Sequence, residues 1–295
     1  MDINDKYIME FKLGEGGFAK VYQAQCNNSG TAKAIKVIRE AVKKYGRASA
    51  EIEVLQKCKH PSIIVLEDQI RLDQGKIGLV FPAYDMDVRQ FIKRRRGLME
   101  EYLDEHKVHI ANGLWHGLEY LHSLSIVHRD IKPANILIKC LSTMHVVLAD
   151  MGLAVDTTKP SSAAGDDNAT ELTAHVCTDG YVAPELLAVR KLDAVSYGSS
   201  IDIWSAAVLA YEVVSLMRFI ASSKSVDVEL RSIASRLGDV QNNVATIAAW
   251  QSAIAEPWQS LIALGLKRRP EERATAKETR APAPSRRQLQ LRRGR

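Results

Sequence analysis

The sequence predicts an α+β protein of two lobes, in which a small, mostly antiparallel β lobe with one helix precedes a larger, mainly helical lobe. Two observations support this fold class. Short β-type runs separated by turn residues fill residues 7–81, and helical periodicity dominates after Pro82. The length of 295 residues is sufficient for either one large domain or two lobes around a substantial core.

The first part of the chain alternates strands and turns. Glycine- and asparagine-rich segments at 14–17 and 27–30 are typical of the tight turns that separate strands. Residues 48–58 have helical spacing, and the dipeptide His60-Pro61 ends this helix. The predicted strands cover residues 7–13, 19–26, 31–38, 63–66 and 77–81.

The second part of the chain is predicted to be mainly helical. A pair of strands at 136–139 and 145–148 interrupts the helices. Residues 156–175 are rich in small and polar side chains and are expected to be mobile, and residues 279–295 form a basic tail that is expected to be disordered. The predicted helices cover residues 87–96, 108–123, 199–216, 226–237 and roughly 244–266.

The composition, with 46% hydrophobic and 25% charged residues, is that of an ordinary globular protein. The N-terminus has no apolar core like that of a signal peptide, and no run reaches the roughly 18 apolar residues of a membrane helix. The net charge of +5 arises in residues 280–295, whose six arginines carry +6, so the other 279 residues sum to −1. We therefore expect no membrane partner and no nucleic-acid partner.

The four cysteines are far apart and form no C-x-x-C pair, which predicts free thiols in a reducing compartment. A cytoplasmic location is expected, with the nucleus as an alternative. The basic run KRRR at 93–96 has three interpretations: the solvated face of a helix, a surface for an acidic substrate, or a site for a nuclear import receptor.

The octapeptide HRDIKPAN, residues 128–135, precedes an apolar, β-prone segment. It combines an acid, a cation and an amide in Asp130, Lys132 and Asn135. Such a set suits phosphoryl transfer, because the carboxylate can orient a hydroxyl, the ammonium can offset phosphate charge, and the amide oxygen can bind a metal ion. His-Arg-Asp alone is a common polar turn, but the whole pattern resembles the catalytic loop of the protein kinases, in the Ser/Thr form that has lysine at the position of Lys132.

A glycine-rich strand–turn–strand lies near the N-terminus. Its glycines let backbone N–H groups approach phosphate oxygens, although a tight hairpin would need the same residues. Because Ala34 and Lys36 follow on the next strand, the segment resembles the G-x-G-x-x-G-x-V loop and A-x-K strand of the kinases, with alanine in place of the third glycine. The loop comprises Leu13, Gly14, Glu15, Gly16, Gly17, Phe18, Ala19, Lys20 and Val21.

Lys36 lies on an apolar strand, where a lysine needs a partner. Glu51 on the following helix is the predicted partner, and Glu53, on a different face of that helix, is the alternative. Asp150 ends an apolar run beside Gly152, which suits metal coordination next to phosphates. The sequence Asp-Met-Gly resembles the kinase D-F-G motif, and methionine can fill the same apolar pocket as phenylalanine.

Three later motifs complete the resemblance. The sequence APE at 183–185 and the sequence DIWS at 202–205 resemble conserved kinase segments, and Arg273 matches the late arginine that pairs with Glu185 in the family. Seven motifs in the right order indicate a eukaryotic-type Ser/Thr protein kinase, nearest to the cyclin-dependent and MAP kinase group. The resemblance implies a bilobal kinase domain at 7–278, with an N-lobe at about 7–81, a hinge at 82–84 and a C-lobe at 85–278.

The resemblance also implies the cofactors and the role of each residue. ATP would bind between the lobes with Mg²⁺, and a protein would be the substrate. Asp130 would accept or orient the substrate hydroxyl, while Lys132 and Thr178 would steady the transferring phosphate and Asp130. Lys36 and Glu51 would hold the ATP phosphates. The further implied contacts are Val21, Ala34 and Leu137 to adenine, Phe81 as gatekeeper, Pro82 and Tyr84 in the hinge, and Asn135 and Asp150 to Mg²⁺.

The sequence departs from that group in ways that concern regulation. Val182 stands where the group has the arginine that shapes a pocket for proline after the acceptor. Around the candidate phosphorylation site Thr173, Arg129 is present, but Ala50 and Val155 replace the two other arginines that clasp the phosphate. We therefore predict weak dependence on phosphorylation at Thr173. The identity of a regulatory subunit is left open.

Two other functions remain as alternatives. A pseudokinase that acts as a scaffold or allosteric binding module would lack Lys36, Asp130 or Asp150, and all three are present. A small-molecule kinase would tend to lack the APE segment and the long loop before it.

Residues after 278 also differ from the usual kinase ending, in which an apolar helix packs under the C-lobe.

Overall fold

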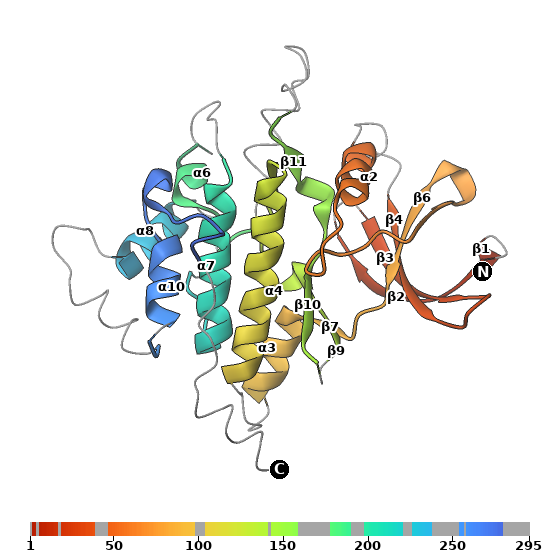
Figure 1. Ribbon diagram of the computed structural model, residues 1–295, viewed down its shortest axis with the longest axis horizontal. Coiled ribbons are helices and arrows are strands. Elements are labelled where there is room, and N and C mark those ends of the chain that lie inside the picture. Colours follow the sequence, from red (N-terminus) through yellow and green to blue (C-terminus); the bar gives the residue numbers. More distant parts are fainter. Residues whose placement is uncertain are drawn as a thin grey trace.

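The computed structural model describes most of the chain, namely residues 2–3, 6–16, 19–38, 47–97, 104–140, 143–158, 178–189, 198–220, 226–237, 254–256 and 258–279. These residues form two lobes, with a β-sheet on one side and a group of helices on the other (Figure 1). Predictions for the loop beyond 158 and for the tail beyond 279 lie outside the described residues. Thr279, assigned to the tail, is buried and donates a hydrogen bond to the Thr275 carbonyl.

The N-lobe is a six-stranded antiparallel sheet with the strand order β1-β2-β3-β4-β6-β5. A turn at 27–30 joins β3 to β4, as predicted, with Gly30 in the left-handed region that favours glycine. The helix α2 (Arg47–Lys57) lies between the sheet and the C-lobe in Figure 1. The strands are β1 (Asp2–Ile3), β2 (Tyr7–Glu15), β3 (Ala19–Cys26), β4 (Ala32–Ile38), β5 (Asp68–Arg71) and β6 (Ile77–Pro82).

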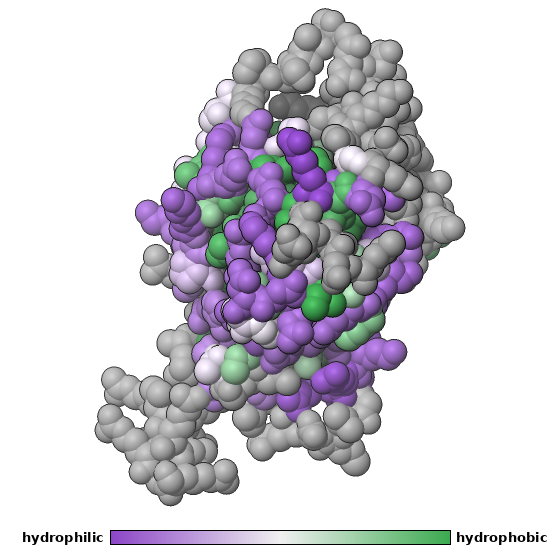
Figure 2. Space-filling view, turned by 90° about the vertical axis from the view of Figure 1, so that its right-hand side faces the viewer, coloured by the Kyte–Doolittle hydropathy of each residue, from purple (hydrophilic) through white to green (hydrophobic). Residues whose placement is uncertain are grey.

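The two faces of this sheet pack against different surroundings because side chains alternate along a strand. On β4, Ile35 belongs to a small outer cluster with Val80 and three other buried residues of the sheet. Ile38 and Ala34 face the other way and pack on the main core. Figure 2 shows the surface on the N-lobe side of the molecule, where hydrophilic residues predominate and hydrophobic ones lie among them. We call the face that carries Ala34 and Ile38 the inner face, because these residues pack in the same core as residues of the C-lobe.

The C-lobe is built around the helix α7, whose residues 201–213 are all buried. The helix α4 crosses the strand β10, and Gly113 and Gly117 allow the close approach of the two elements. The helices are α3 (Val88–Gly97), α4 (Asp104–Ser123), α6 (Pro184–Val189), α7 (Ser200–Ser215), α8 (Val226–Leu237) and α10 (Trp258–Gly265).

Short strands and 3₁₀ turns place the loops of the C-lobe. The strand pair β9–β10 follows the segment 128–135, and β8 pairs with β11 on its other side. The strands are β7 (Met86–Asp87), β8 (Ile126–Val127), β9 (Ile136–Cys140), β10 (His145–Leu148) and β11 (Val155–Asp156), and the turns are η1 (Asp73–Gly75), η2 (Pro133–Asn135), η3 (Met151–Leu153) and η4 (Pro270–Glu272).

One main hydrophobic core runs through both lobes. Leu79 and Phe81 of the sheet and Leu55 of α2 belong to the same cluster as Leu118 of α4 and Trp204 of α7. Because the core is continuous, the two lobes are packed against each other through apolar contacts as well as through the connecting strand. Among the described residues, no helix has the length and apolar character needed to cross a membrane.

The strand predicted at 63–66 is wrong. Ile63 forms only a single parallel bridge to Leu148 of β10, and the next strand of the sheet is the polar segment β5. Ile63 and Ile64 are buried in the main core and Val65 is exposed, whereas β5 is an edge strand in which only Ile70 is buried. Hydrophobicity alone thus pointed to the wrong neighbour.

The single helix predicted at roughly 244–266 is also wrong. Residues 254–256 are not helical, and α10 begins at Trp258. Pro257 explains the break, because the residue before a proline is disfavoured in the helical conformation. The earlier part of this prediction, up to residue 253, lies outside the described residues.

The other predicted elements agree with the structure to within two residues, except that α4 begins at Asp104 instead of residue 108. The start of α3 at Val88 instead of residue 87 has a clear cause. The Asp87 carboxylate accepts a hydrogen bond from the Gln90 N–H at 2.7 Å, and the Gln90 side-chain oxygen accepts one from the Asp87 N–H at 3.1 Å. Asp87 is therefore the cap of the helix and not its first residue.

We predict that Gly113→Ala destabilises the protein. A Cβ atom at this position would lie 2.6 Å from the Val146 Cβ and 2.9 Å from the Val146 carbonyl oxygen, so α4 and β10 would have to move apart. The free energy of unfolding should fall by about 1 to 3 kcal/mol in urea denaturation, after allowance for the better helix propensity of alanine.

The matched control is Gly198→Ala, where an added Cβ meets no atom within 4 Å. This variant should unfold within about 0.5 kcal/mol of the wild-type chain. Equal stability of both variants would contradict the proposed close packing of α4 on β10.

Candidate active site

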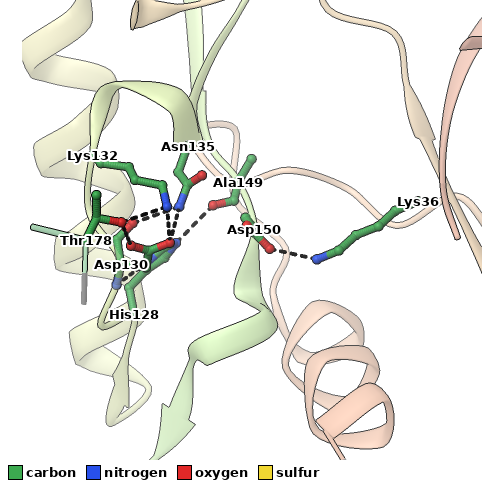
Figure 3. A network of polar contacts seen from close by, with 8 residues as sticks. All are labelled: Lys36, His128, Asp130, Lys132, Asn135, Ala149, Asp150 and Thr178. Carbon is green, nitrogen blue, oxygen red and sulfur yellow. Dashed lines mark hydrogen bonds and ion pairs between the residues drawn. The ribbon is translucent and has the colours of Figure 1, made fainter. Parts of the chain in front are cut away.

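Three side chains of the predicted set form a closed triangle of hydrogen bonds (Figure 3). The Lys132 ammonium lies 2.7 Å from Asp130 Oδ2 and 2.9 Å from Thr178 Oγ1, and the Thr178 hydroxyl donates to Asp130 Oδ1 at 2.8 Å. Asp130 is buried, and Lys132 and Thr178 are half-buried. The sequence places Thr178 48 residues after Asp130, so only the fold brings it to the carboxylate.

Asn135 is fixed with a defined orientation by the same loop. Its side-chain nitrogen donates to the Asp130 backbone oxygen at 2.8 Å and to Asp130 Oδ2 at 3.0 Å. The amide oxygen therefore points away from Asp130, as Figure 3 shows. An oriented amide oxygen of this kind is a suitable ligand for a hard divalent cation.

A second polar group faces this triangle from the N-lobe side. Lys36 on β4 lies 2.6 Å from Glu51 Oε1 of α2 and 2.7 Å from Asp150 Oδ1, so the predicted partner Glu51 is the one that it contacts. The alternative, Glu53, is exposed. Burial lowers the pKa of the Lys36 amine, but the carboxylates of Asp150 and Glu51 raise it by more, so the amine is held in its charged form.

Asp150 occupies an unusual backbone conformation between these two groups. Its φ of 63° lies in the left-handed region, and the following Met151 is buried in the core, as predicted for this apolar side chain. Burial raises the pKa of Asp150, but the adjacent Lys36 lowers it by more. The carboxylate is thus kept ionised beside the lysine.

Sequence reasoning gave no role to His128, which is fully buried in the loop. Its Nδ1 accepts a hydrogen bond from the Asp130 N–H at 3.2 Å, and its Nε2 donates to the Ala149 carbonyl at 3.0 Å. The imidazole therefore connects the segment before Asp130 to the segment before Asp150. The only signal in the sequence was its position next to two other motif residues.

Sequence reasoning also gave no role to Asp202, which anchors the loop to α7. Its carboxylate accepts hydrogen bonds from the backbone N–H groups of His128 and Arg129, each at 2.8 Å, and from His122 Nε2 at 3.0 Å. Burial raises the pKa of Asp202, but these donors lower it by more. Arg129 has a φ of 68°, a conformation that a non-glycine residue keeps only when its surroundings enforce it.

The segment after Thr178 is held by a buried ion pair. The Arg273 guanidinium donates to both oxygens of Glu185, at 2.6 and 2.7 Å, and also to three backbone carbonyls. The Arg273 side chain has no solvent exposure and lies over the ring of Trp204 at 5.2 Å. This is the pair that the sequence predicted, and it joins η4 to α6 and α7.

A neighbouring contact was not predicted. The Tyr181 hydroxyl donates a hydrogen bond to the buried carboxylate of Glu212 on α7, and Arg96 Nη2 lies 3.4 Å from the other oxygen of Glu212. Arg96 also donates to the Leu216 carbonyl. The basic run at 93–96 therefore lies in a helix and sends one of its arginines to α7.

The apolar residues predicted to contact a nucleotide base lie on the inner face of the sheet or beside it. Ala34 pairs with Phe81 across β4 and β6, and Val21 pairs with Lys36 across β3 and β4. Phe81 is buried, while Val21, Ala34 and Leu137 are half-buried. Half-buried apolar side chains next to the charged group are what a flat apolar ligand with an anionic tail would need.

The residues of the hinge and of the glycine-rich loop lie at the edges of this face. Pro82 and Tyr84 are half-buried, and the Asp85 N–H donates to the Ile138 carbonyl of β9. In the glycine-rich loop, Gly14 pairs with Val21, Lys20 and Glu15 form an ion pair at 3.8 Å, the Gly16 N–H donates to the Ala19 carbonyl, and Leu13 is 52% exposed. Gly17 and Phe18 lie outside the described residues.

Within the described part of the chain, no group of three or more His, Cys, Asp and Glu side chains could hold a metal ion. The Asp150 carboxylate and the oriented amide oxygen of Asn135 are the side chains that would hold a cation together with a ligand. Mg²⁺ is commonly bound in this way, through one or two protein ligands and phosphate oxygens. The arrangement suits the positioning of a hydroxyl at Asp130 and of an anionic ligand at Lys36 and Asp150.

Comparison with known proteins gives one family. A model of the protein kinase domain matches residues 7–282. Cyclin-dependent kinase 1 of Encephalitozoon cuniculi is 34% identical over 238 residues, which cover 79% of this chain and 74% of that protein. Mitogen-activated protein kinase 15 of Caenorhabditis elegans is 31% identical over 69% of this chain, and serine/threonine-protein kinase PLK4 of Drosophila persimilis is 30% identical over 70% of it. The matched regions span 42% and 25% of these two longer proteins.

We predict that Arg273→Lys lowers the free energy of unfolding by about 2 kcal/mol. A lysine keeps the charge but cannot donate to both oxygens of Glu185, and it leaves buried carbonyls without a donor. Thermal and urea denaturation would measure the change.

The control for this prediction is Arg269→Lys, at an exposed arginine that lies 3.9 Å from Glu272. It should change stability by less than about 0.5 kcal/mol. If the two substitutions had the same effect, the buried pair would have no special part in holding the segment that carries Thr178.

Proposed function

This chain belongs to the protein kinase family, in its serine/threonine branch, and we propose that it transfers the γ-phosphate of ATP to serine and threonine hydroxyls of protein substrates. The observation that carries this proposal is the pair of polar groups facing each other in one site. Asp130, Lys132 and Thr178 form one group, and Lys36 with its two carboxylates forms the other. The first group would position the hydroxyl that accepts the phosphate, and the second would hold the ATP that donates it.

The residues fit ATP and Mg²⁺, which protein kinases generally use. The Lys36 ammonium would bind phosphate oxygens, and Glu51 would keep it directed into the site. Asp150 and Asn135 supply a carboxylate and an amide oxygen, the hard oxygen ligands that Mg²⁺ prefers. Half-buried Val21, Ala34 and Leu137 would contact the adenine, with the buried Phe81 behind them and the hinge residues Pro82 and Tyr84 at the edge.

When bound, Mg·ATP supplies an electrophilic phosphoryl group whose negative charge is partly neutralised. Asp130 orients the substrate hydroxyl and accepts its proton as the new O–P bond forms and the bond to the leaving ADP breaks. Lys132 offsets the charge of the transferring phosphoryl group. The Thr178 hydroxyl and the Asn135 amide hold the Asp130 carboxylate in place, so little reorganisation is needed at the moment of reaction.

The scaffold alternative finds no support in these observations. A pseudokinase would be expected to have lost the lysine or one of the two aspartates, and here Lys36, Asp130 and Asp150 are present and mutually positioned. The matched regions span 74%, 25% and 42% of the three relatives described above, so the activity and the protein substrate of the whole molecule are proposed here and not inferred from those relatives.

The decisive experiment is radiolabelled phosphate transfer from Mg·ATP to a degenerate mixture of serine and threonine peptides. Asp130→Asn should lower kcat by about 100- to 10,000-fold, because the amide cannot accept the proton of the hydroxyl. Binding of a fluorescent ATP analogue should be retained, since Asp130 belongs to the acceptor group and not to the Lys36 group.

Asp73→Asn, at an exposed aspartate of η1, is the matched control and should leave both measurements unchanged. Nucleotide binding without transfer by the wild-type chain would favour the scaffold alternative. Transfer that persists in Asp130→Asn would remove Asp130 from the proposed mechanism.

We further propose that activity depends only weakly on phosphorylation of Thr173. Thr173 lies outside the described residues, but the three positions that would bind its phosphate are described. Ala50 and Val155 are exposed and carry no charge, and Arg129 Nε already donates to the Leu153 carbonyl at 2.6 Å. A phosphate there would gain few charge-assisted hydrogen bonds.

Thr173→Ala should therefore keep more than about a tenth of the wild-type kcat/KM, because one charge-assisted contact contributes little. Phosphate-free protein, verified by mass spectrometry, is the comparison. A fall below a tenth would show that a phosphate at Thr173 has partners that these three positions do not supply.

A further inference from the structure

The exposed side of α3 carries a line of basic side chains. Arg89, Lys93 and Arg96 are spaced at i, i+4 and i+7, which places them on one side of the helix. All three are exposed, whereas Phe91 and Ile92 of the same helix are buried in the core. Arg218 is also exposed, and it follows α7 two residues after Leu216, whose carbonyl accepts a hydrogen bond from Arg96. We refer to Arg89, Lys93, Arg96 and Arg218 as the basic stripe.

The stripe lies next to the residues that position the acceptor. The helix α3 contacts the turn η2 of the catalytic loop. Arg96 reaches Glu212, Glu212 accepts a hydrogen bond from Tyr181, and the Tyr181 N–H donates to the carbonyl of Thr178 at 3.1 Å. Thr178 in turn contacts Asp130, so a continuous series of contacts leads from the stripe to the acceptor carboxylate.

The buried carboxylate of Glu212 is already paired with groups of this chain. Glu212 is 6% exposed, receives the Tyr181 hydroxyl on one oxygen and lies 3.4 Å from Arg96 on the other. Arg96 also donates to the carbonyl of Leu216, which lies two residues before Arg218. A basic substrate residue would therefore find Glu212 already paired with groups of this chain.

The local charge balance favours a negative partner. Among the described residues, the two acids that contact the stripe are Asp87, 3.4 Å from Arg89, and Glu212. Within the described part of the chain, two of the four cations of the stripe therefore have no contacting acid. Lys93 and Arg218 are the cations that carry this excess, and both are exposed.

We propose that the basic stripe binds acidic residues that flank the phosphorylated serine or threonine, so that this kinase prefers acidic protein substrates. The inference rests on the proposed kinase function and adds the substrate class to it. The helical conformation argues against the alternative of a nuclear import receptor. In a helix, the side chains of residues 93–96 point in four directions, and Arg94 lies outside the stripe, so the run is not presented as one basic peptide.

The test uses the full chain and three peptides of equal length, each with one serine flanked on both sides by Glu, Gln or Lys. The wild-type kcat/KM for the Glu peptide should exceed that for the Gln peptide by about fivefold at low salt, as expected for a few exposed ion pairs. High salt should reduce this ratio towards one. The double variant Lys93→Glu, Arg218→Glu should abolish or invert the ratio.

Arg94→Glu is the matched control, since it makes the same charge reversal on the same helix but outside the stripe. It should keep the wild-type preference. A ratio of one or less in the wild-type chain would overturn the proposal, and so would an equal loss of preference in Arg94→Glu. If the basic run at 93–96 instead bound a nuclear import receptor, the wild-type ratio of kcat/KM for the Glu and Gln peptides would be one.

A binding measurement separates this inference from the kinase proposal itself. Fluorescence anisotropy with labelled Glu and Gln peptides, in which alanine replaces the serine, needs no transfer. Tighter binding of the Glu peptide that the double variant removes would support the stripe even if no peptide were phosphorylated, in which case the kinase proposal alone would fail. Transfer to all peptides with no preference, and equal binding, would overturn the stripe and leave the kinase proposal intact.

Discussion

The buried carboxylate of Asp202 is the constraint on which the rest of the site depends. A carboxylate at 1% exposure is stable only if hydrogen bonds replace its lost water, and here the donors are the backbone of His128 and Arg129 and the ring of His122. The hydrogen bonds to the Asp202 carboxylate of α7 thus fix the loop at 128–130 in one conformation, which includes the positive φ of Arg129. Asp130 follows directly, so the direction of its carboxylate is set by a charge in the first turn of the central helix.

A second set of charges couples the two lobes. Lys36 comes from the sheet, Glu51 from α2 and Asp150 from the C-lobe. The lysine lies 2.6 Å from Glu51 and 2.7 Å from Asp150. A lysine shared by two carboxylates is sensitive to where each lobe places its acid. The same principle recurs in a structural role at Arg273, which joins Glu185 to the carbonyls around η4. In both places a cation links segments that are distant in sequence, and at the fully buried Arg273 the cost of leaving a partner unpaired keeps them together.

Much of the fold and of the site could be predicted because short motifs carry strong local chemistry. The contacts of Lys36 with Glu51 and of Arg273 with Glu185 were both expected from the sequence and are present. Errors arose where one signal had two causes. Ile63 and Ile64 are buried in the main core without forming a strand, since hydrophobicity reports burial and not backbone pairing. Asp202 and Glu212 escaped notice as anchors because a lone acid in an apolar helix does not reveal which backbone amides or arginine the fold will bring to it.

The strand β4 has a further consequence for the evolution of this chain. Its odd-numbered Ile35 packs in the outer cluster, while the even-numbered Ala34, Lys36 and Ile38 face the candidate active site and the main core. Point substitutions at either set can be accommodated by their own surroundings. An insertion or deletion of a single residue upstream in the strand would exchange the two sets and move the lysine to the wrong side of the sheet. Length variation in this lobe should therefore be confined to its connecting turns, such as the one at 27–30, while β4 itself keeps a fixed number of residues.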